Sequence, residues 1–294
     1  MEEIEIVSWS QFGEAVNRID QLRATTEKQH GGRPLVKAIF RGVGNSHWGL
    51  STTLERSFPM ERSAPVVTLS GYYRKISTSQ PAVETMTGNK WEDLPDWQTF
   101  QRMLNEQAEE WIDSLLEKNV AIYRYLVYLR HHGFPSPLLD WTASPYVAAL
   151  FAFDSMDKDA EQVALYAYLQ DTIHLSAADE HFFMVGPYLR THPRHYLQQS
   201  RYSLCVSLRV EGSGENRRVD YLFCPHEQVL TRDRQSNTDL LVKLKIPASE
   251  RRAALEQLDS MNINPFSLFG SEESLIRTVA RRECLFKGWP VVLS

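Results

Sequence analysis

The sequence predicts an α+β fold in which a helical N-terminal half packs on a β-rich core. Apolar residues recur at helical spacing before residue 154, and short runs rich in strand-forming residues follow Asp159. Composition agrees, because 43% hydrophobic and 23% charged residues are ordinary values for a globular chain. The 294 residues can bury a sizeable core, and we expect one domain at 36–294 behind a lead-in at 1–35.

The lead-in is expected to hold one strand and one helix. Residues 3–7 alternate as a strand does, and Ser8 or Ser10 can cap the helix that follows. That helix places four apolar residues on one face: Phe12, Val16, Ile19 and Leu22. The polar residues 25–34 should end it.

The middle of the chain alternates between irregular and helical patterns. A β-like run at 36–40 is followed by the Ser-, Thr-, Pro- and Gly-rich residues 51–95, which indicate irregular chain with short helices. Residues 97–130 carry a long helical pattern. A further helix should begin at Ser144 and Pro145, because serine caps helices and proline suits their first position.

The last part of the chain is expected to supply the sheet. Four strand-like runs lie at 163–169, 204–210, 219–223 and 240–247. Two helical patterns, at 248–261 and 271–286, close the chain.

Net charge and cysteine content limit the classes of function and the cellular location that we expect for this protein. The 32 Lys and Arg against 37 Asp and Glu give a net charge of −5, which argues against a general nucleic-acid binder. Three cysteines without a CxxC pair are typical of reduced thiols in the cytoplasm. The acidic N-terminus does not resemble a signal peptide, and no apolar run approaches 18 residues. We therefore expect a cytoplasmic protein without a membrane partner.

Arg41 and Gly42 form the first candidate site. They follow a short strand-like run, so we expect the guanidinium at the start of a loop, with Gly42 allowing close backbone approach. An arginine there can clamp a phosphate or carboxylate through two N–H donors, although a surface ion pair is the common alternative.

The second candidate site surrounds Asp140. This residue stands between two helical patterns, and His131 precedes it. We expect Asp140 to pair with backbone N–H groups at the start of the next helix, with a direct functional role as the alternative. Trp141 or Trp48 could stack on a nucleobase or nicotinamide, although a tryptophan more often belongs to the core.

No metal site is expected. His192 and His195 have nearly the spacing of metal ligands but lack a third ligand nearby, which favours a solvated loop. The motifs of P-loop enzymes, Rossmann dehydrogenases, zincins and α/β-hydrolases are absent from the sequence.

Two stretches together resemble the FRG domain family, which is named for the tripeptide Phe40, Arg41 and Gly42. They are FRGVGNSHWGLSTTLER at 40–56 and HHGFPSPLLDWTASPYVAALFAF at 131–153. The resemblance extends to about residue 285. Because the family is largely uncharacterised, it implies no particular activity.

A second resemblance, to ADP-ribosyltransferases of the arginine–Ser–Glu type, implies an ADP-ribosyltransferase-like fold with NAD as substrate. Arg41 and Gly42 are similar to the first element of those enzymes, and Thr142 with the following Ala-Ala-Leu-Phe-Ala helix to the second. Glu227, ahead of Val229 and Leu230, is similar to the strand glutamate.

That resemblance implies a role for each candidate residue. Arg41, Thr142 and Glu227 would be catalytic. The residues that hold NAD would be Arg41, Gly42, His131, Asp140 and Trp141. The arginine would bind the pyrophosphate, and the glutamate would stabilise the ribosyl cation.

Two classes of function remain open. The first is an NAD-consuming transferase or glycohydrolase that acts as a toxin or antiphage effector, with nucleic acid among the acceptors. The second is a non-catalytic module that binds a nucleotide, a nucleic acid or a partner or trigger protein. The enzyme needs Glu227, or another acidic residue, close to Arg41, whereas the binding module needs only a basic and aromatic cleft. A structure that shows whether Arg41, Thr142 and Glu227 line one cavity is therefore the first test.

Overall fold

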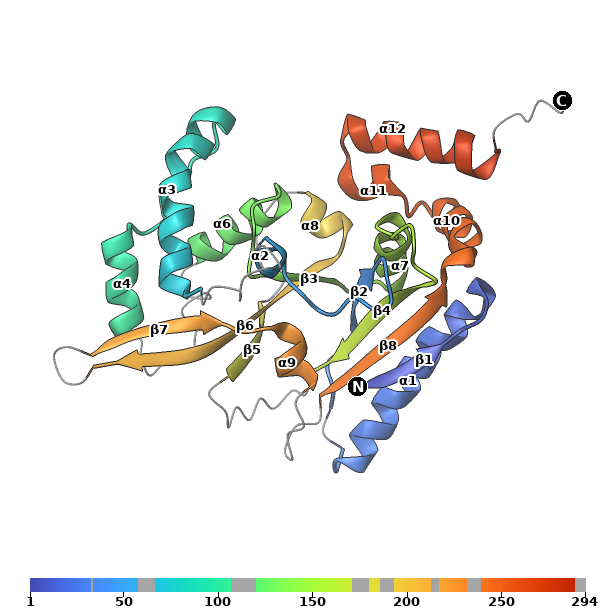
Figure 1. The fold of residues 1–294 in the computed structure, drawn as a ribbon, viewed down its shortest axis with the longest axis horizontal. Helices are drawn as coiled ribbons and strands as arrows, with labels where there is room; N and C mark the ends of the chain where they lie inside the picture. The colour runs from blue at the N-terminus through green and yellow to red at the C-terminus, as the bar shows by residue number, and fades with distance from the viewer. Residues whose placement is uncertain are drawn as a thin grey trace.

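The computed structural model describes residues 1–32, 34–57, 67–106, 120–170, 180–185, 193–212, 217–231 and 239–288 (Figure 1). The strands are β1 (Glu2–Glu5), β2 (Ile39–Val43), β3 (Leu139–Thr142), β4 (Gln162–Leu169), β5 (Glu180–Val185), β6 (Ser200–Glu211), β7 (Arg218–Phe223) and β8 (Leu240–Pro247). The α-helices are α1 (Phe12–Gln29), α2 (Thr53–Arg56), α3 (Leu69–Thr87), α4 (Trp97–Glu106), α6 (Val120–His131), α7 (Pro145–Asp154), α8 (Arg194–Leu197), α9 (His226–Thr231), α10 (Arg251–Ser260), α11 (Pro265–Phe269) and α12 (Glu272–Ala280). Short helical turns lie at η1 (Trp9–Gln11), η3 (Ala248–Glu250) and η4 (Arg281–Phe286).

The described strands form one mixed sheet in the order β1-β8-β4-β2-β3-β6-β5, with β7 paired to β6. β1 runs parallel to β8, and the other pairs are antiparallel. β2 pairs with β4 over its whole length but shares one registered position with β3, Phe40 with Thr142. The centre of the sheet is therefore weakly joined at the β2–β3 edge, and Arg41 lies beside this junction.

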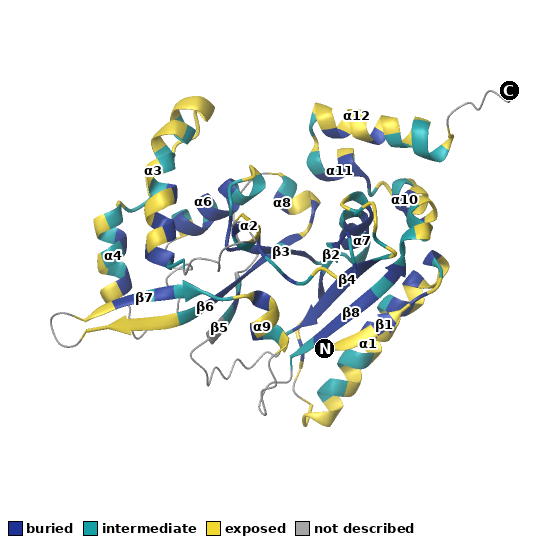
Figure 2. Ribbon diagram, viewed as in Figure 1, coloured by how far each residue is buried: buried dark blue, intermediate teal, exposed yellow. Residues whose placement is uncertain are grey.

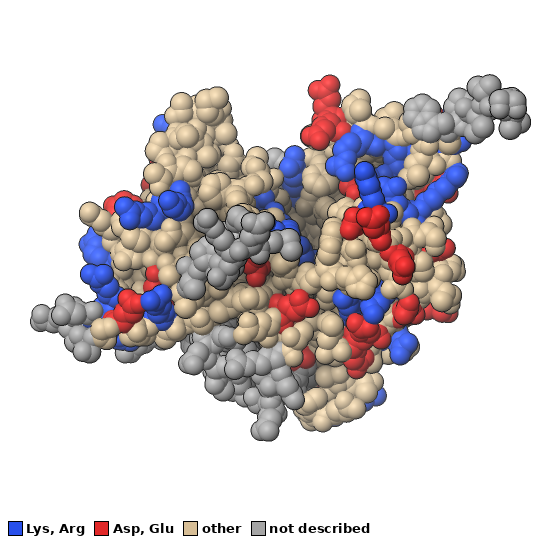
Figure 3. All heavy atoms as spheres, viewed as in Figure 1, with Lys and Arg blue, Asp and Glu red and all other residues tan. Residues whose placement is uncertain are grey.

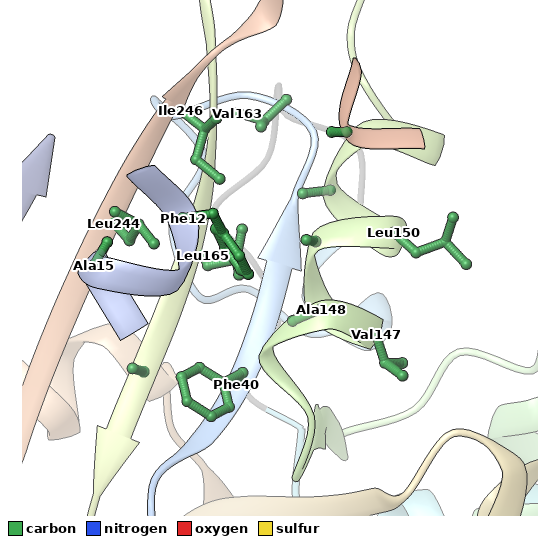
Figure 4. Packing of buried hydrophobic residues seen from close by; sticks show 14 of the residues in the cluster. Phe12, Ala15, Phe40, Val147, Ala148, Leu150, Val163, Leu165, Leu244 and Ile246 are labelled. Atoms are coloured by element: carbon green, nitrogen blue, oxygen red, sulfur yellow. The ribbon is translucent and has the colours of Figure 1, made fainter. Parts of the chain in front are cut away.

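The largest core packs against β4, β2 and β8 and is covered by α1, α7 and α10 (Figure 4). Phe12 of α1, Leu165 of β4 and Ala148 of α7 belong to it. Helix α7 is apolar on all sides, which suits a helix buried among other elements (Figure 2). Its start is fixed by Ser144, whose hydroxyl accepts a hydrogen bond from the Val147 N–H, with Pro145 next.

A second core lies at the other end of the sheet, where α3, α4 and α6 pack against β6 and β7 (Figure 1). A smaller third cluster occupies the opposite face of the central strands and includes Trp141 and Tyr166. The two helical groups thus stand at opposite ends of one sheet.

The α+β fold class predicted from the sequence is confirmed. The predicted helix at Ser144 and Pro145 and the four late strand-like runs are also confirmed, as α7, β4, β6, β7 and β8. Of the predicted helix at 97–130, α4 and α6 form the two ends, and 107–119 lies outside the described residues.

Two predictions about the helices were wrong. Helix α1 continues to Gln29, because its polar residues favour helix and no glycine or proline lies between Gly13 in its first turn and Gly31. Helix α3 occupies 19 residues of the stretch 51–95, which was predicted to be irregular with short helices. Thr68 caps it, and four residues at helical spacing bury one face: Leu69, Tyr72, Tyr73 and Ile76.

None of the helices in the described residues combines the length and the apolar character that a membrane span requires.

Candidate functional site

A cavity of about 880 Å³ lies over β2 and β3, between the two helical groups. Its walls come from β2 and the loop that follows it, from β3, and from α6, α7, α8, α11 and α12. The space-filling view shows the molecule hollowed at this place, with Lys and Arg atoms inside the hollow (Figure 3). Six of the seven residues expected at the site line this cavity: Arg41, Gly42, His131, Asp140, Trp141 and Thr142.

Arg41 joins β2 to β3 through its side chain. Its Nη1 donates to the main-chain carbonyl of Asp140 over 2.9 Å, and its Nε has no hydrogen-bond partner among the described residues. Arg41 is the third residue of β2, so the prediction that it begins a loop was wrong. The strand continues to Val43 because both Ile39 and Val43 are buried and paired with β4.

Three guanidinium groups gather around one carboxylate. Arg130 of α6 forms an ion pair with Oδ2 of Asp140, while Arg56, at the end of α2, donates to the Ser51 carbonyl over 2.5 Å. Burial, opposed by Asp140 and aided by Arg130 and Arg56, lowers the pKa of Arg41 to about 10. The pKa of Arg56 is also lowered, by burial and then by Arg130. Three guanidinium groups around one carboxylate give the cluster a surplus of positive charge.

The expected helix-capping role of Asp140 was wrong. Asp140 lies in strand β3, whose alternating pattern buries Leu139 and Trp141, and the hydroxyl of Ser144 caps α7 instead. Oδ1 of Asp140 has no hydrogen-bond partner among the described residues. The Asp140 carboxylate therefore provides the negative charge within the arginine cluster that lines the cavity.

Thr142 holds two neighbouring segments together. Its hydroxyl donates to the Gln198 carbonyl over 2.7 Å and accepts from the Ser144 N–H over 3.1 Å. These two bonds tie β3 to the end of α8 and to the start of α7. These two hydrogen bonds give the Thr142 hydroxyl a structural role that does not depend on catalysis.

Gly42 allows a close backbone approach, and the approaching backbone is that of α7. A Cβ on Gly42 would lie 1.9 Å from the carbonyl oxygen of Ala148 and 2.7 Å from the nitrogen of Ala152. The glycine therefore lets α7 pack directly on β2 and so sets one wall of the cavity.

His131 belongs to a buried polar network. Its Nε2 lies 2.7 Å from the Tyr202 hydroxyl, and Nδ1 of His195 lies 3.3 Å from the same oxygen. His195 is buried on α8, so the prediction of a solvated loop was wrong for it, while His192 lies outside the described residues. The stacking of the His195 ring on Tyr202 explains this burial.

The two candidate stacking tryptophans differ in access. Trp141 is 2% exposed, and its Nε1 donates to the Ser203 hydroxyl over 2.8 Å. Trp48 also lines the cavity and is 46% exposed. A ligand ring therefore has access to Trp48 rather than to Trp141.

Glu227 stands apart from the other expected residues. It lies in the first turn of α9 rather than on a strand, because Pro225 starts a helix that buries His226 and Val229. It is not among the described residues that line the cavity. Its Oε2 lies 1.9 Å from where a Cβ on Gly49 would be, so its carboxylate packs against the backbone of a loop that does line the cavity.

The sequence at the site matches a known family model. Residues 36–161 match the model of the FRG domain, and the matched segment ends before β4. The chain carries an FRG domain. No curated protein and no solved structure matches the chain.

The FRG match contains the arginine cluster but only part of the cavity. Arg194 of α8, Phe269 of α11 and Arg277 of α12 also line it, and all three lie beyond residue 161. Nε of Arg194 donates to the Phe269 carbonyl over 3.4 Å, and its guanidinium lies 5.4 Å from the centre of the Phe269 ring. The FRG segment and a second wall, formed by Arg194, Phe269 and Arg277, therefore line one site.

Sequence reasoning missed the second wall and two of the three clustered arginines. Arg56 is the last residue of the first FRG stretch, and Arg130 directly precedes the second, so the motifs themselves could have suggested them. Arg194 and Arg277 carry no local motif, and the fold alone brings them to the cavity. Within the described residues, no group of His, Cys, Asp or Glu has the arrangement of a metal site.

Proposed function

We propose that this FRG-domain protein binds a small phosphate-bearing ligand in the cavity, and that the ligand is NAD, consumed as a substrate. The observation that carries the proposal is the cluster of Arg41, Arg56 and Arg130 around the single carboxylate of Asp140. Guanidinium groups bind phosphate oxygens through paired N–H donors, and partial burial strengthens such contacts.

The shape of the site supports a small ligand over a nucleic acid. The arginines lie inside a cavity of about 880 Å³, which is within the range of small-molecule pockets. Nucleic-acid binders instead present basic side chains along an open surface, and this chain has a net charge of −5. A nucleic acid fits better as an acceptor than as the ligand held in the cavity.

Consumption of NAD requires a carboxylate near the ribose. In this reaction the bond between ribose C1′ and the nicotinamide nitrogen breaks, and nicotinamide leaves with the electron pair. The acceptor, or water in a glycohydrolase, then bonds to C1′ and releases a proton. Asp140 lines the cavity beside the arginines, whereas Glu227 lies behind Gly49. Asp140 is therefore the better placed group to stabilise the ribosyl cation.

The biological setting that we propose is that of a toxin or antiphage effector acting with a partner or trigger protein. It rests on the FRG resemblance. A non-catalytic nucleotide-binding module is the second candidate, and the engagement of the Thr142 hydroxyl by Gln198 and Ser144 favours it.

The test is calorimetric titration with NAD, followed by detection of released nicotinamide. Wild type should bind NAD, Arg41→Ala should bind it at least about tenfold more weakly, and Arg41→Lys should recover only part of the loss because an ammonium cannot form the paired contact. Arg282→Gln, outside the cavity lining, is the control.

The outcomes separate the two candidates. Binding with nicotinamide release supports the enzyme, and binding without release, even with a trigger protein present, supports the non-catalytic module. Absence of NAD binding by wild type overturns the proposal.

A further inference from the structure

The cavity has a second cluster of arginines, at Asp154 on the opposite wall. Asp154 ends α7 and accepts from Nη2 of Arg277 over 2.6 Å and from Nη2 of Arg281. Arg251 donates to the Phe153 carbonyl over 3.1 Å and lies near enough to Arg281 to affect its titration. One carboxylate is therefore paired with two guanidinium groups, and a third lies close to one of them.

The surplus of positive charge at Asp154 persists at neutral pH. Burial lowers the pKa of Arg281, and Asp154 opposes that effect while Arg251 and Arg277 add to it. Arginine stays charged under these conditions. Since a single carboxylate cannot neutralise three guanidinium groups, this cluster too is suited to an anion.

Arg277 brings the second cluster to the cavity. It lines the cavity and its side chain is 47% exposed, whereas Arg281 is largely buried behind it. Lys and Arg atoms cover the α12 side of the hollow in the space-filling view (Figure 3). A ligand held at Arg41 can therefore meet a second cationic group across the same cavity.

The charges of the lining exceed those that NAD can satisfy. Among the described lining residues, five are arginines (Arg41, Arg56, Arg130, Arg194 and Arg277) and two are aspartates (Asp140 and Asp154). NAD carries two negative charges on its pyrophosphate and one positive charge on its nicotinamide. A phosphomonoester adds about −1.5 to −2 at neutral pH.

We infer that Arg277 and the Asp154 cluster form a second anion subsite, and that the preferred ligand is a pyrophosphate-linked nucleotide carrying an additional phosphomonoester. This inference rests on the proposed function for the first cluster. The extra phosphate contacts Arg277, while the pyrophosphate lies at Arg41.

The pair NAD and NADP tests the inference, because NADP differs from NAD only by a phosphate on a ribose 2′-hydroxyl. Calorimetric titration of wild type should give NADP at least about tenfold higher affinity, which is the effect of one good charge-assisted contact. In Arg277→Gln the ratio of the two affinities should fall toward one. Arg41→Ala should weaken both nucleotides.

A matched control is Arg282→Gln. Arg282 is 48% exposed and paired with Asp259 over 2.7 Å, much as Arg277 is paired with Asp154, but it is not among the described lining residues. It should keep the wild-type ratio, and thermal melting should show whether each variant is folded.

Each other outcome has a distinct meaning. Equal affinities of wild type for NAD and NADP overturn the second subsite and leave the proposed function standing. A preference for NADP that survives in Arg277→Gln overturns the assignment to Arg277. Failure of both nucleotides to bind overturns the proposed function itself.

Discussion

Nη1 of Arg41 donates to the carbonyl oxygen of Asp140 over 2.9 Å, although 98 residues separate the two in the chain. The bond crosses the junction between β2 and β3, where the register contains the single pair Phe40 and Thr142. The guanidinium thus supplies a hydrogen bond between β2 and β3 where backbone pairing is sparse. Arg41 also lines the cavity. This arginine links the stability of the sheet centre to the binding of an anion.

Asp140→Asn should separate the two roles of the arginine cluster. The amide keeps the shape but leaves Arg130 without a countercharge, which should cost roughly 1–2 kcal/mol of unfolding free energy because the pair is only partly buried. The same change makes the cluster more positive, so affinity for inorganic pyrophosphate should not fall. Urea denaturation and calorimetry measure the two effects, and a loss of pyrophosphate binding in a folded variant would contradict the prediction.

Gly42→Ala should be severely destabilising. The added methyl group would meet the backbone of α7, 1.9 Å from the Ala148 oxygen, and a helix backbone cannot move aside as a flexible side chain can. We expect a loss of roughly 3 kcal/mol or more, or failure to fold.

The control for Gly42 is Gly13→Ala in α1, where nothing lies within 4 Å of the added atom. It should leave stability unchanged or raise it by up to about 1 kcal/mol. Thermal melting of the two variants gives the comparison, and equal melting temperatures would show that α7 adjusts to a side chain at Gly42.

Helices and strands with a clear period or a cap could be predicted from the sequence. Ser144 and Pro145 start α7 through local chemistry, and β4, β6, β7 and β8 follow from runs of strand-forming residues. β3 was missed because a four-residue strand is too short to show its period, and its pairing with β6 joins residues about 60 apart.

At the site too, residues within a sequence motif could be predicted, whereas residues that only the fold brings together could not. Arg41 and Asp140 could be found because each belongs to a motif. The surplus of charge could not, because Arg56, Arg130 and Arg277 come to line one cavity only when the sheet has formed. Glu227 was assigned to a strand by analogy, and Pro225 instead places it on α9.

His226 should make the protein sensitive to acid. Its side chain is 1% exposed, and burial, aided by the charge of Arg41, lowers its pKa from 6.5 to about 3. Between these values the unfolded chain binds a proton that the folded protein does not, so stability falls as pH drops from about 6.5 to 3. The slope from this one group is about 1.4 kcal/mol per pH unit.

The measurement is unfolding free energy against pH for wild type and His226→Leu, with His30→Gln, at an exposed position after α1, as control. The curve of His226→Leu should be flatter than that of wild type in this window, and that of His30→Gln should keep the wild-type slope. Parallel curves for wild type and His226→Leu would show that other groups cause the acid sensitivity.

The carboxylate that supports NAD consumption can be identified by comparing Glu227→Gln with Asp140→Asn. A group that stabilises the ribosyl cation must lie in the cavity, and Asp140 lines it, whereas Glu227 packs against Gly49. Nicotinamide release should therefore fall on the order of a hundredfold in Asp140→Asn, with NAD binding retained, because the lost charge acts mainly in the transition state. Glu227→Gln should change release far less. The opposite order, in variants that thermal melting shows to be folded at the assay temperature, would restore Glu227 as the catalytic carboxylate and would require the loop at Gly49 to open during the reaction.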